Sequence, residues 1–225
     1  MCWLTAWLSV SILVVYCDGS VCEEPEDSKP RSDTQFRGEV ELSVPLYEEL
    51  YLVLGADLRL ARVEENRFVR GEIGVLYDYE VNDYLSLVPR YRYRATDEFE
   101  GESEEEHRFS INGIARLHFK RLTVSDYNLF EWRLRESGDE TRYRNRLRLG
   151  YLIEAAGQEL EVFVSDEVYY EWSEQAWTRN RFKVGLGKAL TDQLSAELYY
   201  MKQIDKSDRP NDIDVLGVDI EIEIQ

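Results

Sequence analysis

The chain has 225 residues, and its 27 basic against 45 acidic residues give a formal net charge of −18. Hydrophobic residues make up 44% and charged residues 32%, with a mean hydropathy of −0.47. These values exclude a helical membrane protein, which needs apolar runs of about 20 residues. The acidic balance argues against binding to nucleic acid, because such binding needs Lys and Arg to neutralise phosphates. A membrane β-barrel is not excluded, since only every second residue of its strands faces lipid.

The amino-terminal segment has the pattern of an export signal. Residues 3–16 form an uncharged run of 14 residues that is followed by small residues, which is typical of a secretory signal peptide and too short to span a bilayer. We predict a signal peptide over 1–22 and a disordered acidic leader, rich in Pro and Ser, over 23–33. A lipoprotein signal with Cys17 or Cys22 as the acylated residue is the alternative. All three cysteines lie in this segment, so the rest of the chain can form neither a disulfide nor a Cys metal site.

From residue 34 onward, apolar and polar side chains alternate with a period of two, which is the pattern of strands with unlike faces. The clearest case is 142–151, where Arg occupies every second position up to Arg148 while Tyr143, Leu147 and Leu149 share the other face. On a helix these arginines would point in nearly every direction. In chain order the pattern predicts strands over 35–44, 50–61, 67–80, 85–94, 107–119, 128–135, 142–151, 159–171, 178–186, 194–204 and 213–224.

The lengths of these segments and of their connections favour a membrane barrel. Most segments have nine residues or more, whereas strands of globular proteins are usually 5–6 residues long. A strand that crosses a bilayer at about 45° needs roughly 9–11 residues. Short connections also alternate with longer, more charged ones, as periplasmic turns and outer loops do in bacterial barrels. We therefore predict an all-β fold, an antiparallel transmembrane β-barrel of about 10–12 strands over 34–225. Eleven segments are counted, although a closed antiparallel barrel needs an even number.

Two arrangements can bury the apolar faces. In a soluble secreted β-barrel or sandwich the charges face water, and in a membrane barrel they face the interior. Aromatic residues such as Tyr77, Tyr91, Trp132, Tyr151 and Trp172 lie towards strand ends, which resembles the aromatic girdles of membrane barrels. The polar faces carry both signs, so neighbouring strands can pair charges inside. The soluble alternative explains export and periodicity but not the strand lengths.

Four motifs of the second half point to a family. They are FEWRLR at 130–135, RYRNRLRL at 142–149, RNRFKVGLG at 179–187 and LYY at 198–200. In this order they resemble a bacterial family, domain of unknown function 2490, over roughly residues 35–224. The resemblance implies an outer-membrane barrel with Arg-rich strands and, since the family has no established activity, no catalytic residues. The last residues, Glu223-Ile224-Gln225, depart from the aromatic end that is common among outer-membrane barrels and is read during assembly.

The sequence offers little for catalysis or for metal binding. The two histidines, His107 and His118, lie at opposite ends of one predicted strand, ~35 Å apart at strand rise. Ser110 is close to His107 along the chain but on the other face of the strand. The segment 97–106 has seven acidic residues in ten but lacks the spacing of a calcium loop, so a solvated outer loop is favoured. We predict no enzyme, no cofactor and no metal; an outer-membrane lipid-modifying enzyme is the least favoured alternative.

The inward charges form the candidate site. Its members are Arg90, Arg92, Arg94, Arg133, Arg135, Arg142, Arg144, Arg146, Arg148, Arg179, Arg181, Glu159, Glu161, Glu167, Asp219, Glu221 and Glu223. We call this set the Arg/Glu network. One interpretation is structural, since a small barrel fills its interior with side chains and buried charges need partners. The other is a narrow pore whose charges select small ions or solutes. The structural interpretation is favoured, and the sequence leaves open whether the lumen conducts.

The predicted location is the bacterial outer membrane, with export by the signal peptide. The expected partners are outer-membrane lipids and, during insertion, the barrel-assembly machinery. No nucleic acid and no specific protein partner is predicted. The physiological role is not given by the sequence.

Overall fold

The structure, a computed structural model, describes residues 32–61, 67–97, 103–206 and 211–224. The predicted signal peptide and nearly all of the predicted leader lie outside these residues. Eleven strands are present: β1 Ser32–Tyr47, β2 Leu50–Ala61, β3 Arg67–Asn82, β4 Leu85–Asp97, β5 Ser103–Phe119, β6 Leu122–Arg135, β7 Glu140–Ala155, β8 Gln158–Glu171, β9 Ala176–Ala189, β10 Leu194–Asp205 and β11 Asp212–Glu223. The first strand begins two residues before the expected start of the barrel at 34. In the described part of the chain, no helix is long and apolar enough to cross a membrane.

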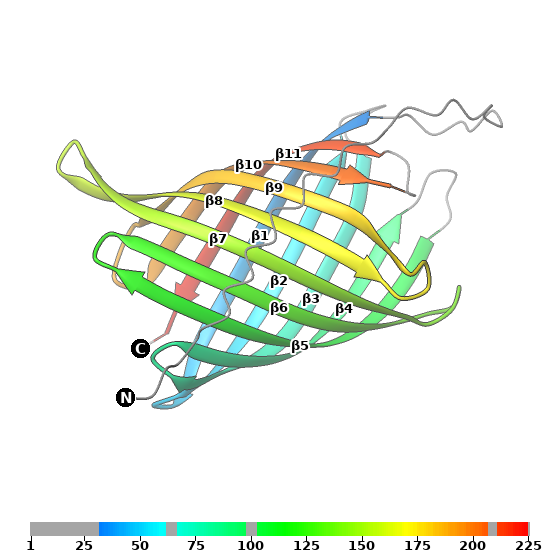
Figure 1. Cartoon of the computed structure of the whole chain (residues 1–225), viewed down its shortest axis with the longest axis horizontal. Helices are drawn as coiled ribbons and strands as arrows, with labels where there is room; N and C mark the ends of the chain where they lie inside the picture. Colours follow the sequence, from blue (N-terminus) through cyan, green and yellow to red (C-terminus); the bar gives the residue numbers. More distant parts are fainter. Residues whose placement is uncertain (1–31, 62–66, 98–102, 207–210, 225) are drawn as a thin grey trace, which may run out of the picture.

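The strands form one closed barrel (Figure 1), in which each strand pairs with its neighbours in sequence and β1 closes onto β11. Consecutive strands are antiparallel, whereas β1 and β11 are parallel, in register from Ser32 opposite Asp212 to Ser43 opposite Glu223. The all-β barrel of about 10–12 strands is thus confirmed, and all eleven predicted segments are strands; the closure between β1 and β11, however, is parallel. A parallel ladder also pairs the backbone groups of both edges, so an odd number of strands closes without leaving a free edge.

The two rims of the barrel differ in their connections. At one rim, which we call the short-turn rim, the linkers are 48–49, 83–84, 120–121, 156–157 and 190–193. The positive φ angles of Ala156 and Gly157, 53° and 74°, match the tight hairpin turns that follow the twist of a sheet. At the other, the long-loop rim, the linkers are 62–66, 98–102, 136–139, 172–175 and 206–211. Because β1 and β11 are parallel, β1 starts at the long-loop rim and β11 ends at the short-turn rim.

The two faces of the wall follow the alternation of the sequence. On β4, Leu87 is 41% exposed on the outer face, while the neighbouring Val88 is 2% exposed on the inner face. The outer face carries the large apolar side chains, among them Phe130, Leu147 and Leu216. Asp166 is a polar exception: it lies exposed on the outer face, where it accepts a hydrogen bond of 2.8 Å from Asn180 Nδ2.

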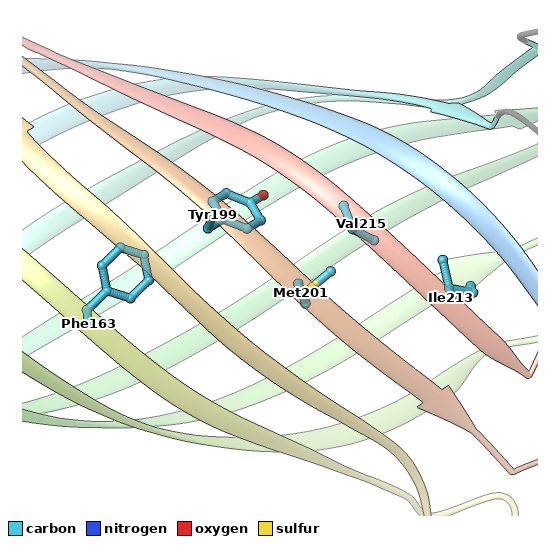
Figure 2. Packing of buried hydrophobic residues seen from close by; sticks show 5 residues of the cluster. All are labelled: Phe163, Tyr199, Met201, Ile213 and Val215. Carbon is cyan, nitrogen blue, oxygen red and sulfur yellow. The ribbon is translucent and has the colours of Figure 1, made fainter.

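The inner face also carries two apolar clusters that the sequence pattern did not predict. One consists of Phe163 on β8, Tyr199 and Met201 on β10, and Ile213 and Val215 on β11 (Figure 2). Glycines on the adjacent strands make room for its rings. A Cβ on Gly217 would lie 2.0 Å from Tyr199 Cζ, and a Cβ on Gly185 would lie 2.6 Å from Phe163 Cζ. The rings therefore lie flat across neighbouring strands, as aromatic side chains do over glycine in sheets. The second cluster is Val53, Leu76, Val88 and Ile114, from β2 to β5.

Candidate functional site in the lumen

The barrel encloses a cavity of about 670 Å³ that is lined by residues from all eleven strands. Its volume lies within the usual range of small-molecule sites, about 300–1,000 Å³. Its wall is mostly charged, with the second apolar cluster as one uncharged area. The lumen is therefore the candidate site.

Most members of the Arg/Glu network line this cavity. They are Arg90, Arg92, Arg94, Arg142, Arg144, Arg146, Arg148, Arg179, Arg181, Glu161, Glu167, Asp219, Glu221 and Glu223. Three members do not line it. Arg133 and Arg135 pair with Glu140 near the long-loop rim, at 2.9 and 2.6 Å. Glu159 is exposed beside the 156–157 turn.

In the half of the lumen towards the long-loop rim, carboxylates are buried among guanidinium groups. Glu131 is 1% exposed, and its oxygens lie 2.8 Å from Arg142, 3.2 Å from Arg144 and 3.4 Å from Arg108. Glu106 is also 1% exposed and pairs with Arg108 and, at 2.8 Å, with Arg133. A buried carboxylate is tolerated when its lone pairs are satisfied in this way.

Further carboxylates extend the same arrangement around the wall. Glu72 on β3 receives Arg92 at 2.6 Å and Arg94 at 2.8 Å, and Glu167 on β8 receives Arg144 at 2.6 Å. We call the resulting set the long-loop cluster: Glu72, Arg92, Arg94, Glu106, Arg108, Glu131, Arg133, Arg142, Arg144 and Glu167. It joins β3 to β8 without a break.

Sequence reasoning missed four members of this cluster as site residues: Glu72, Glu106, Arg108 and Glu131. Their positions could have identified them, because each lies at one of the alternate positions of its strand whose side chains face the lumen. Glu106 was assigned to a solvated acidic loop at 97–106, and this was wrong because β5 begins at Ser103 and carries Glu106 into the interior. The acidic segment thus contains one glutamate, Glu106, that is buried in the barrel interior.

Some ion pairs cross the interior instead of linking neighbouring strands. Arg92 on β4 reaches Glu39 on β1 at 3.3 Å, and Arg148 on β7 reaches Glu197 on β10 at 2.7 Å. In each case two strands stand between the partners in the sheet. These side chains therefore occupy the space of the lumen as well as its wall.

The half of the lumen towards the short-turn rim is different. The acidic residues Glu80, Glu221 and Glu223 line the cavity there and are exposed. Within the described ranges none of the three is in an ion pair. Solvent reaches this end, which we call the vestibule.

The two histidines lie on opposite faces of β5. His107 is on the outer face, with Nδ1 at 2.8 Å from Tyr91 OH, while Ser110 is buried on the inner face. His118 is exposed near the short-turn rim, 3.2 Å from Thr123 Oγ1. The structure thus brings neither histidine to Ser110, and His118 lies at the mouth of the lumen beside Thr123 of the cavity lining.

The closed barrel, with its apolar exterior and polar lumen, defines the class of protein as an outer-membrane-type β-barrel. Residues 23–214 match the family model described as protein of unknown function DUF2490. The match spans most of the chain, so the chain belongs to this family, as its motifs predicted. A search of curated proteins found no match.

Two solved structures are similar to this chain at low sequence identity. LpxR from Salmonella typhimurium is 10% identical, with a TM-score of 0.52 over 80% of this chain and 84% of that one. The NanC porin is 11% identical, with a TM-score of 0.44 over 79% of this chain and 92% of that one. At these identities the likeness to LpxR establishes the fold alone.

Proposed function

We propose that this chain is a non-enzymatic barrel of the bacterial outer membrane whose lumen is closed to ordinary solutes at the long-loop rim. In this proposal the vestibule opens to the periplasm, and solutes enter it from that side. The observation that carries the proposal is the burial of Glu106 and Glu131, each 1% exposed, among guanidinium groups. A water-filled passage at that level would leave these charges hydrated.

The outer-membrane location is supported by the length of the strands and the composition of the outer face. Strands of 12 to 17 residues exceed the roughly 9–11 residues that a tilted strand needs to cross a bilayer. Short turns face the periplasm in bacterial barrels, which gives the proposed orientation. We expect the expressed chain to fractionate with outer membranes and to shift in gel mobility on heating. A soluble chain whose mobility is insensitive to heat contradicts the location.

Conductance across a planar bilayer tests closure. We expect the refolded full chain to pass no porin-sized current, because the long-loop cluster and the cross-lumen pairs fill the passage. Folding is confirmed in the same sample by heat-modifiable mobility. A steady porin-sized current from the folded chain contradicts the proposal.

A narrow pore is the second candidate, and one observation favours it. The cavity lining runs from Ser43 and Glu223 at the short-turn rim to Arg70 and Arg179 in the other half of the barrel. A chain of charged side chains can pass small ions from one site to the next. A small, ion-selective current in the same recording would support this candidate over a fully closed barrel.

The enzyme alternative receives less support from the geometry. A hydrolytic mechanism needs a nucleophile within hydrogen-bond reach of its base, and His107 and Ser110 lie on opposite faces of β5. We expect no lipid hydrolysis by the folded chain. Hydrolysis that is abolished in a His107→Ala variant would contradict this part of the proposal.

A further inference from the structure

Among the cavity-lining arginines of the described chain, Arg90, Arg116 and Arg146 form no ion pair. Arg90 and Arg146 both line the cavity, and the Nε of each is buried without a hydrogen-bond partner among the described residues. By contrast, Arg92 pairs with Glu39 and Glu72, and Arg148 with Glu161 and Glu197. A buried polar hydrogen without an acceptor is costly, and each of these two guanidinium groups has one such N–H at Nε, so both can gain from an anion that enters the cavity.

Both arginines border the same apolar patch. The patch is the second apolar cluster, Val53, Leu76, Val88 and Ile114, with Tyr51 and Tyr127 packed against it, and every one of these residues lines the cavity. The guanidinium carbon of Arg146 lies 4.0 Å from the ring centroid of Tyr127. Arg90 follows Val88 by two positions on β4 and so projects from the same face of that strand. Cationic and apolar surfaces thus meet at one place in the lumen.

We propose that this place binds a small organic monoanion, a carboxylate with an apolar or aromatic body. The carboxylate lies against Arg90 and Arg146, because guanidinium groups bind carboxylates through charge-assisted hydrogen bonds. The body of the ligand covers the apolar patch, as in most small-molecule sites. We name Arg90, Arg146, Tyr127 and the second apolar cluster together the monoanion site.

The surroundings of the monoanion site narrow the class of ligand. The cavity of about 670 Å³ limits the size of the ligand. The exposed carboxylates of Glu80, Glu221 and Glu223 at the vestibule repel multiply charged anions more strongly than monoanions. A sugar acid or inorganic phosphate would leave the apolar patch uncovered. The inference rests on the proposed function in one respect, namely that ligands enter from the short-turn rim.

Calorimetry with three probes tests the proposal on the folded full chain in detergent. The probes are 3-phenylpropionate, its neutral analogue 3-phenylpropionamide, and acetate, which has the charge without the body. We expect saturable one-to-one binding of 3-phenylpropionate and roughly tenfold weaker binding of each analogue, since a hydrogen bond to a charged group and the burial of a ring are each large enough for this. The proposal fails if the acid shows no saturable binding, or if the amide binds as tightly as the acid.

Variants locate the binding. We expect Arg90→Gln and Arg146→Gln each to weaken binding of 3-phenylpropionate roughly tenfold, and Arg90→Lys to retain much of it. Arg121→Gln, in the exposed 120–121 turn, is the matched control and should bind as the wild type does. Heat-modifiable mobility identifies any variant that has not folded. If Arg90→Gln does not fold, the affinities of Arg90→Lys and Arg146→Gln for 3-phenylpropionate test the site. Wild-type affinity in both folded glutamine variants overturns the monoanion site.

Conductance keeps this inference separate from the proposed function. If the wild-type chain is closed but shows no saturable binding of 3-phenylpropionate, the monoanion site is wrong and the closed barrel stands. If the chain conducts as an open porin and still binds the probe through Arg90 and Arg146, the closed barrel is wrong and the site stands.

Discussion

The two halves of the lumen use the same residue types in different ways. In the half towards the long-loop rim, Glu106 and Glu131 are each 1% exposed and each pair with two or more guanidinium groups. In the vestibule, Glu221 and Glu223 are exposed and have no ion pair within the described chain. Alternating charge along a strand therefore does not decide whether a lumen is packed or solvated.

Register across the strands contributes to the difference, although the packed half also places Arg108 opposite Arg92 and opposite Arg133. On the packed side Glu131 of β6 lies opposite Arg142 of β7, so opposite charges meet directly. At the closing seam, β1 and β11 place Glu39 opposite Asp219 and Glu41 opposite Glu221. Like charges directly opposite each other are destabilising in a sheet. The parallel closure that completes the barrel thus also concentrates carboxylates at one end of it.

The largest expected effect is at Glu131. Its replacement in Glu131→Gln removes the negative charge that Arg108, Arg142 and Arg144 share. Removing one partner of a buried ion pair typically costs about 3–5 kcal/mol, so the midpoint of urea unfolding in phospholipid vesicles should fall strongly. Glu221→Gln, an exposed carboxylate of the vestibule, is the control and should change the free energy of unfolding by less than about 0.5 kcal/mol. Equal losses in the two variants would erase the distinction between the halves.

Conductance should respond to the same distinction. Replacing Glu106 and Arg133 together with alanine removes the ion pair of 2.8 Å between them and the pairs that they form with Arg108 and Glu140. We expect a current several-fold above that of the wild type in planar bilayers. The matched double variant, Glu221→Ala with Glu223→Ala, removes two side chains from the vestibule and should leave the current unchanged. A current from the vestibule variant alone would place the constriction at the opposite end from the one proposed.

The comparison also separates what the sequence predicts from what it cannot predict. The period of two is local, so it predicted the strands, their apolar outer face and the inward direction of Arg142 and Arg144. This alternation cannot predict which strands close the barrel, because the pairing of β1 with β11 joins segments at opposite ends of the chain. The same limit explains why Arg90 and Arg92 looked alike in the sequence, although within the described chain Arg92 forms ion pairs with Glu39 and Glu72 and Arg90 forms none.

Two other features were hidden for a different reason. The inward apolar residues, such as Val88 and Met201, sit among charged residues of the same parity, and a search for charged rows passes over them. Glu106 lay in a stretch whose overall acidity indicated a loop. In both cases the overall character of the surrounding sequence indicated a different environment from the one that the residue has. Only the position of its side chain on the inner or outer face of the strand distinguishes it.

The smallest expected effect concerns the closing seam itself. In Glu221→Lys a cation replaces the exposed carboxylate opposite Glu41, so a repulsive cross-strand pair becomes an attractive one. Cross-strand charge pairs contribute roughly 0.2–1 kcal/mol, and exposure to solvent reduces this. We expect the free energy of unfolding to rise by about 0.5 kcal/mol at low salt, measured by urea unfolding.

Glu223→Lys is the matched control for the seam, because Glu223 is another exposed acid of the vestibule on β11 but lies opposite Ser43 instead of a carboxylate. It should leave the unfolding midpoint unchanged. The gain of the Glu221 variant should also shrink at 1 M salt, where the Debye length is about 3 Å. A gain of equal size in both variants would mean that the net charge of the chain, not the parallel pairing of β1 with β11, sets the stability of this end.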